Sequence, residues 1–122
     1  MALTDLYPMT LEFATCYSPS VGATPVVGYM TMPFRGYIVE FGSVLGGTIT
    51  TTNATVTVAD GTTSTTIGTF TIVASGSAGG TVSTGNPSSI VLLQEDDAIT
   101  FTSAGASGSS IPATFFAKFA KG

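Results

Sequence analysis

The sequence predicts an all-β protein, a single antiparallel β-sandwich, on three observations. Apolar residues recur at every second position in many short segments, which is the period of a strand that buries one face. Segments rich in glycine, serine, asparagine and proline separate these strands at intervals of about ten residues. No longer window has a helical period. With 122 residues, the chain is long enough for one two-layer core.

The clearest alternation lies in the middle of the chain, in residues 35–73. In its first strand the alternation places Ile38 and Phe41 on opposite faces. Gly46-Gly47 and Asp60-Gly61 are the turn signals that separate neighbouring strands. The pattern predicts three strands, at residues 37–45, 54–60 and 66–73.

Weaker alternation predicts further strands on both sides of this segment. Residues 1–10 contain Pro8 and are expected to form an extended arm, so that the sandwich domain comprises residues 11–122. We expect a jelly-roll-like strand order, with an immunoglobulin-like order as the alternative, because both orders show the same alternation. The further strands are predicted at residues 11–17, 26–32, 81–84, 90–93, 98–103 and 111–119.

Charge is scarce in this sequence. Charged residues make up 8% of the chain, the net charge is −4, and there is no histidine. Because net charge keeps protein molecules apart, a chain with so little of it is expected to belong to an assembly. The three cations, Arg35, Lys118 and Lys121, are too scattered to neutralise several phosphates, so nucleic acids are excluded as partners. No apolar run is long enough to span a membrane and no signal-peptide pattern is present, so no membrane association is expected.

No group of residues predicts catalysis or metal binding. Histidine, the usual general base near neutral pH, is absent, and there is no G-x-S-x-G motif. Glu95, Asp96 and Asp97 are adjacent, but they lack the spacing and the glycine of a calcium loop and are expected to form a solvated turn. Cys16 is expected to be a buried thiol that acts as a small hydrophobe, which favours assembly in a reducing compartment. We therefore expect no enzymatic activity, cofactor, metal or small-molecule substrate.

Four segments follow one another in a recognisable order. They are the strand ATVTV at 54–58, the strand GTFTI at 68–72, a Ser/Gly turn at 75–80 and the hairpin DAITFTSAG at 97–105. In this order they resemble the decoration (cement) proteins of tailed-bacteriophage heads and related modules of phage fibres. The resemblance covers residues 36–119. Asp96 stands where the family has a glycine before the aspartate of the hairpin.

The resemblance implies a β-sandwich that trimerises on the outside of the capsid and bridges neighbouring copies of the major capsid protein. It also implies assembly in the host bacterial cytoplasm and a place in the virion. The arm and the Met/aromatic segment before the central strand are the candidates for partner contact, with core filling as the other interpretation of that segment. The candidate residues are Leu3, Leu6, Tyr7, Tyr29, Met30, Met32, Phe34 and Arg35.

A second function comes from a different class, a receptor- or carbohydrate-binding module of a phage tail fibre or adhesin. Sugar-binding surfaces commonly expose Trp or Tyr, whose rings are apolar on their faces and polar at one end. This chain has no Trp, and Tyr17, Tyr29 and Tyr37 lie in predicted strands. The sequence therefore favours decoration over sugar binding.

Overall fold

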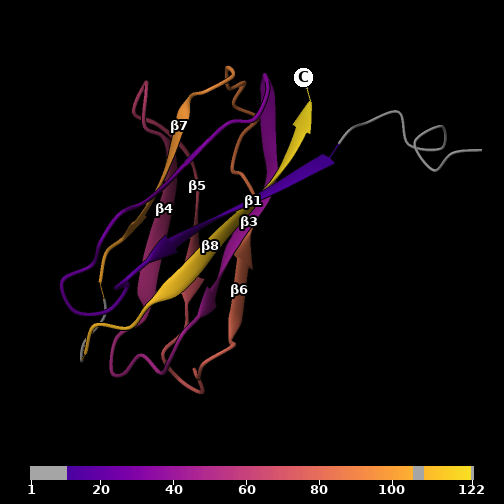
Figure 1. Cartoon of the computed structure of the whole chain (residues 1–122). Helices are drawn as coiled ribbons and strands as arrows, with labels where there is room; N and C mark the ends of the chain where they lie inside the picture. Colours follow the sequence, from indigo (N-terminus) through magenta and orange to yellow (C-terminus); the bar gives the residue numbers. More distant parts are fainter. Residues whose placement is uncertain (1–10, 106–108, 122) are drawn as a thin grey trace, which may run out of the picture.

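The computed structural model describes residues 11–105 and 109–121, which form two antiparallel four-stranded sheets packed face to face (Figure 1). This confirms the prediction of an all-β sandwich. The predicted arm, residues 1–10, lies outside the described residues. The strands are β1 (Leu11–Ser18), β2 (Gly28–Thr31), β3 (Gly36–Leu45), β4 (Ala54–Asp60), β5 (Thr65–Ile72), β6 (Val82–Gly85), β7 (Ala98–Ser103) and β8 (Ala113–Lys121).

The strand order nests the second half of the chain around the first. One sheet, called here the β8 sheet, has the order β1-β8-β3-β6, and the other, the β7 sheet, has the order β2-β7-β4-β5. Hydrogen bonds join β4 to β5, β3 to β6, β2 to β7 and β1 to β8. In the sequence, each pair of strands therefore flanks the previous pair, as it would if the chain folded back once between β4 and β5. An immunoglobulin-like sandwich instead places β1 beside β2. The observed nesting differs from that order and is compatible with the jelly-roll-like order that the sequence predicts.

The core lies between the two sheets and is built from inward-facing aromatic and aliphatic side chains. Phe101 of β7 and Phe115 of β8 stack across it, with ring centroids 4.9 Å apart. Burial of each such ring contributes about 1.5–3 kcal/mol to folding, so these contacts hold the two sheets together. The largest fully buried side chains are Phe41, Phe101, Phe115, Phe119, Met32, Ile49, Ile67, Ile72, Leu93 and Ile99.

A β-bulge in β3 changes which side chains reach this core. The register between β3 and β8 shifts between Ile38 and Glu40. An extra residue in one strand reverses the alternation beyond it. As a result Ile38 and Phe41 are both buried, and the prediction that they lie on opposite faces was wrong.

The run at 90–93, predicted as a strand, makes only one isolated bridge. The amides of Leu93 and Gly36 each donate to the other's carbonyl, at 2.7 and 2.9 Å. Leu93 is buried, whereas Ile90 and Leu92 are exposed. This apolar run is therefore a connecting segment that one buried side chain, Leu93, attaches to the core, and it is not a paired strand. The bounds of β4 and β7 agree with the predicted strands at 54–60 and 98–103.

The close packing of β3 against the backbone of β6 and a ring of β8 generates a stability prediction. A Cβ on Gly42 would meet the backbone carbonyl oxygen of Ser83 and the ring of Phe116, the latter at 2.6 Å. Gly42→Ala is expected to lower the free energy of unfolding by about 1–3 kcal/mol because neither strand can move aside. Urea denaturation measures this difference.

Gly47→Ala is the matched control. A Cβ there would contact only the side chain of Ile111, at 3.4 Å. This variant is expected to stay within about 0.5 kcal/mol of the wild type. Equal losses in the two variants would show that Gly42 is not tightly packed against the backbone of β6 and the ring of Phe116.

Candidate interaction surface

The predicted contact segment before β3 is divided between the core and the surface. Met30 and Met32 are buried in the core, so their prediction as partner-contact residues was wrong and the core interpretation holds for them. The physical reason is the alternation of β2, which turns Tyr29 outward when Met30 turns inward. The Tyr29 side chain is 66% exposed.

The remaining predicted contact residues lie in different places. Phe34 is partly buried against the core, and Arg35 is exposed in the turn before β3. Glu40 of β3 pairs with Lys118 of β8, and the distance between Oε1 and Nζ is 2.9 Å. Leu3, Leu6 and Tyr7 lie outside the described residues.

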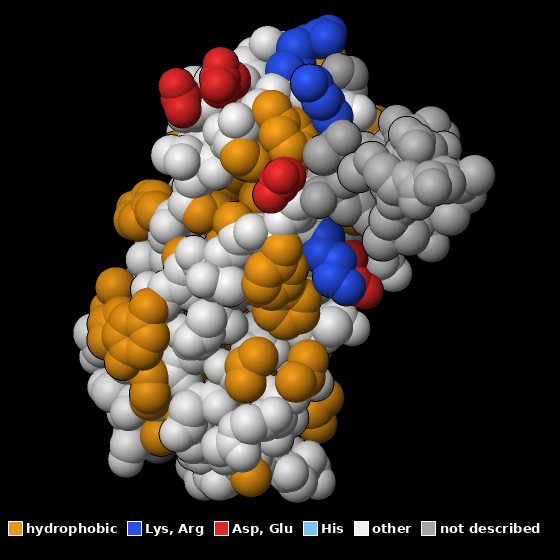
Figure 2. Space-filling view, turned by 45° about the vertical axis from the view of Figure 1, so that its right-hand side comes forward, with side chains coloured by type: hydrophobic (Ala, Val, Ile, Leu, Met, Phe, Trp, Pro, Cys, Tyr) orange, Lys and Arg blue, Asp and Glu red, His pale blue; other side chains and the backbone are white. Residues whose placement is uncertain are grey.

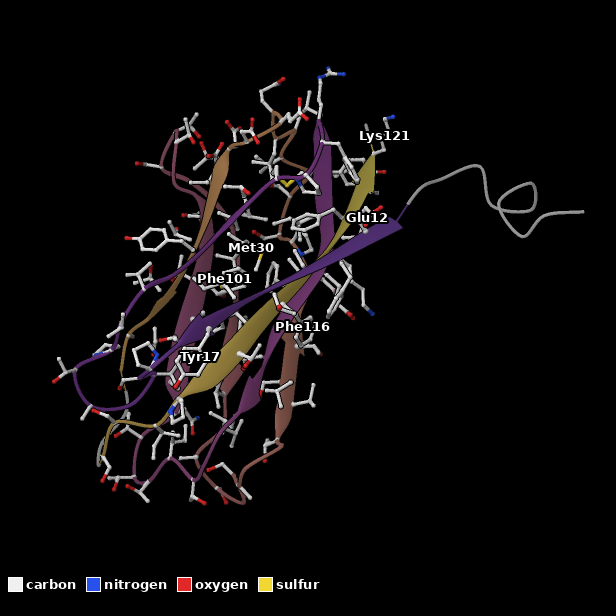
Figure 3. All side chains as sticks on the ribbon, viewed as in Figure 1. Glu12, Tyr17, Met30, Phe101, Phe116 and Lys121 are labelled. Atoms are coloured by element: carbon white, nitrogen blue, oxygen red, sulfur yellow. The ribbon has the colours of Figure 1, made fainter. Side chains whose placement is uncertain are left out.

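The outer face of the β8 sheet carries an apolar surface that the sequence analysis missed. Tyr17, Thr114, Val44 and Val82 stand opposite one another in a row that crosses all four strands. Beside this row the ring of Phe13 stacks on that of Phe116, with centroids 5.7 Å apart. Figure 3 labels Tyr17 and Phe116 on this sheet. The alternation of each strand predicts that these side chains face outward, because their neighbours are buried. It does not predict that they lie side by side on the sheet.

The outer face of the β7 sheet is different in kind. Apart from Tyr29, its outward side chains are almost all threonines, whose hydroxyls are compatible with water. They are Thr31, Thr55, Thr57, Thr66, Thr69, Thr71, Thr100 and Thr102. The two faces of the sandwich therefore offer a polar, uncharged surface and an apolar one.

Four loops at one end of the sandwich are joined by hydrogen bonds and are called here the loop platform. They are residues 19–27, 46–53 and 73–81, together with 104–105 and 109–112 of the loop between β7 and β8. The Ser77 hydroxyl donates to the carbonyl of Ile49 at 3.0 Å and accepts from its amide at 3.1 Å. The amides of Val21, Gly46 and Gly80 donate to the carbonyls of Ile111, Pro112 and Leu45. These bonds connect each loop to a neighbouring loop or to the end of β3.

The acidic segment forms the turn that the sequence predicts. The Asp97 carboxylate accepts a hydrogen bond from the Gln94 amide at 2.9 Å, which closes the turn. Asp96 has φ of 68°, in the left-handed region that favours glycine. Among residues 11–105 and 109–121 no cluster of Asp, Glu, Cys or His could hold a metal ion.

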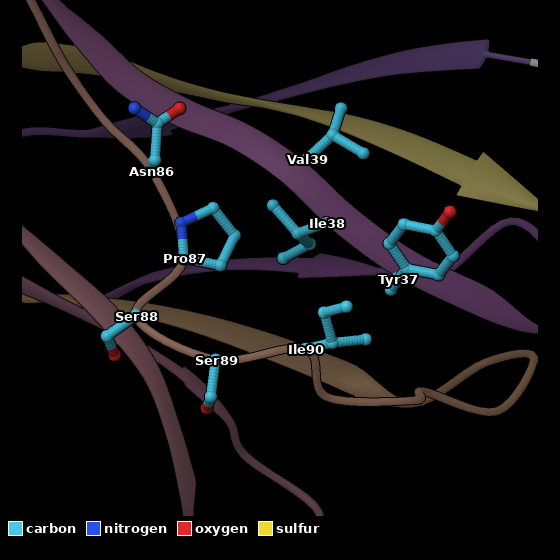
Figure 4. Close-up of a pocket in the computed structure, with 8 residues that line it drawn as sticks. All are labelled: Tyr37, Ile38, Val39, Asn86, Pro87, Ser88, Ser89 and Ile90. Carbon is cyan, nitrogen blue, oxygen red and sulfur yellow. The ribbon is translucent and has the colours of Figure 1, made fainter.

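A groove of about 400 Å³ lies between β3 and the segment that follows β6 (Figure 4). Its wall is apolar along Tyr37 and Ile90, and Ile90 is 84% exposed. The Ser88 hydroxyl, which is also part of the lining, already donates to the carbonyl of Ile67 at 3.1 Å. The groove can hold an apolar side chain, but it has no acid–base pair. It is lined by Tyr37, Ile38, Val39, Asn86, Pro87, Ser88, Ser89 and Ile90.

Cys16 is a free cysteine of β1 that is half-buried and packs against the core. Burial raises the pKa of its thiol from 9.0 to about 11. The neutral thiol therefore dominates at physiological pH, and the residue behaves as a small apolar side chain, as the sequence predicts.

Comparison with known proteins found no match among protein families, curated proteins or solved structures. Nowhere in residues 11–105 and 109–121 is there a helix long and apolar enough to cross a membrane. The function has to be argued from the fold and its surfaces.

The pKa of Cys16 predicts slow alkylation of the native protein. With the thiol pKa raised from 9.0 to about 11, the reactive thiolate at pH 8 is about 100-fold rarer in the folded chain than in the unfolded one. Iodoacetamide is expected to modify the native protein at least that much more slowly than the protein in urea, as followed by mass spectrometry. Equal rates would contradict the burial of Cys16.

The same raised pKa gives a pH dependence with a defined sign. Between pH 9 and 11 the unfolded chain loses the thiol proton before the folded chain does. The contribution of Cys16 is fully present below pH 9 and is lost as the pH rises toward 11. Cys16→Ala should remove this part of the pH dependence from urea-denaturation measurements.

The left-handed conformation of Asp96 predicts a difference between two substitutions that remove the same charge. Asp96→Ala is expected to be less stable than Asp96→Gly by about 1 kcal/mol, because a Cβ is disfavoured at this φ. Thermal unfolding of the two variants measures the difference directly. Equal stability would show that the turn changes conformation when the carboxylate is removed.

Proposed function

We propose that this chain is a structural virion protein that decorates the outside of a tailed-phage head and stabilises it by bridging major capsid subunits. The observation that carries the proposal is the nested strand order of the two sheets. Jelly rolls with this order are a recurrent architecture of viral capsid and lectin domains. The motif resemblance at residues 54–105 leads to the same class of protein by a separate route.

The surfaces support a binding role and not a catalytic one. The outer face of the β8 sheet exposes Tyr17, Val44 and Val82 in one row, as a surface that binds protein would. The groove beside Tyr37 has no titratable pair that could transfer a proton. An assembled shell that binds such a protein is stabilised by mass action, without any reaction.

Trimerisation and the location follow from the same proposal. Three copies around a local axis of the shell can each contact a different capsid subunit, which is how a small domain bridges large ones. The proposed site of assembly is the reducing host cytoplasm, where the free thiol of Cys16 is stable.

A second candidate, a receptor- or carbohydrate-binding module of a fibre or adhesin, gains support from one observation. Tyr17 and Tyr29 lie in strands, yet both are exposed, at 64% and 66%. Tyr29 stands opposite Thr100, so that a ring and a hydroxyl are adjacent on the β7 sheet. This pairing is compatible with stacking on a sugar ring. Lectins also use the jelly-roll architecture.

The proposal is tested on particles of the phage that encodes the chain. Heads that lack it should release DNA at a lower temperature, and adding the purified chain should restore the wild-type temperature with saturable binding. At a free concentration of 100 times Kd, each site contributes about 2.7 kcal/mol. Labelled chain located by electron cryo-microscopy only at a fibre tip would contradict decoration and favour the second candidate.

A further inference from the structure

Among residues 11–105 and 109–121 the charged side chains lie in one half of the sandwich, the half remote from the loop platform. In the β8 sheet none lies beyond the Glu40–Lys118 pair in the direction of the loop platform. The loop platform contains no Asp, Glu, Lys or Arg in any of its four loops. Figure 2 shows charged side chains from the top of the view down to about its middle, whereas the lower part shows only hydrophobic and other uncharged ones. The described charged residues are Glu12, Arg35, Glu40, Asp60, Glu95, Asp96, Asp97, Lys118 and Lys121.

Five of the nine large hydrophobic side chains that are exposed among the described residues lie in the uncharged half, and the other four are Phe13, Tyr29, Ile90 and Leu92. A shallow hollow of about 140 Å³ separates Tyr17 from Val44 and has Pro112 of the loop platform in its wall. The apolar row of the β8 sheet therefore continues into the platform. The exposed hydrophobic residues of this half are Tyr17, Val26, Val44, Val73 and Val82.

We propose that the loop platform and the adjoining row of the β8 sheet form the contact between identical copies of this chain around a rotation axis. Near such an axis each residue meets its own copies, so that any charge there would face a like charge. The chain carries a net charge of −4, and the platform is where copies can approach without that repulsion. Interface cores are likewise depleted of charged residues.

A contact with a different protein would not require this absence of charge. Two unlike surfaces can place opposite charges against each other, which speeds association and selects the partner. The platform is also held in place by its own hydrogen bonds, including those of Ser77 with Ile49, so little ordering is needed on association. The number of copies rests on the proposed function, whereas the position of the contact rests on the charge distribution.

The test compares the same kind of substitution at the two ends of the molecule. Val82→Asp places a carboxylate in the apolar row, and Ile90→Asp places one on the most exposed hydrophobic residue outside the uncharged half. Light scattering over a range of concentrations should show an oligomer for the wild type and for Ile90→Asp. Val82→Asp should raise the dissociation concentration at least about ten-fold.

Two further variants separate charge from misfolding. Val82→Thr keeps the shape of the side chain without adding a charge, and this variant should still assemble. Val73→Asp places a charge on the platform at a loop position outside any strand, and this variant should assemble less well. Circular dichroism should show the same sheet content in all variants. The proposal would be overturned if the wild type stayed monomeric. It would also be overturned if Val73→Asp and Val82→Asp assembled like the wild type, or if Ile90→Asp weakened assembly as much as Val82→Asp does.

The outcomes also separate this inference from the proposed function. Monomeric chain that binds phage heads would reject the self-contact and leave decoration in place. Chain that assembles through the platform but does not bind heads would reject decoration and leave the self-contact in place.

Discussion

The sandwich depends on the two-sided pairing of β8 (Ala113–Lys121). This strand pairs along its length with β1 on one side and with β3 on the other. It sends Phe115 and Phe119 into the core, while Phe116 covers Gly42 on the outer face. Because β1 opens the described part of the chain and β8 closes it, the β8 sheet forms only when distant segments meet. The fold is therefore built mainly from contacts that are remote in sequence, which slows folding relative to local structure.

The strands themselves could be predicted from the sequence, because a period of two is a local property. The bounds of β4 and β7 needed only their alternation and the flanking turn residues. The bulge beside Val39 could not be predicted, because it depends on how β3 aligns with β8 and not on β3 alone. The same limit left two strand orders open, since alternation states which face is buried and not which strand lies alongside.

The interaction surface was harder to predict for a related reason. Met30 and Tyr29 are neighbours in sequence with similar bulk, and only the position of β2 over the core decides which of them is buried. Tyr17, Val44 and Val82 come from three strands, and their row exists because of the register of β1, β8, β3 and β6. The charge separation also comes from topology. The described charged residues are spread from Glu12 to Lys121, and the alternating direction of the strands brings them to one half of the sandwich.

Separate ends allow two different contacts on one small domain. If identical copies meet at the uncharged platform, the other end is left for a different partner, where charge gives selectivity. That end holds Arg35, the acidic turn and the groove beside Tyr37, with an apolar wall that can receive a side chain. A decoration protein needs both kinds of contact at once, one among its own copies and one to the shell. The polar threonine face of the β7 sheet can then stay in water without aggregating, because its hydroxyls are compatible with water and it offers no large apolar area to a neighbour.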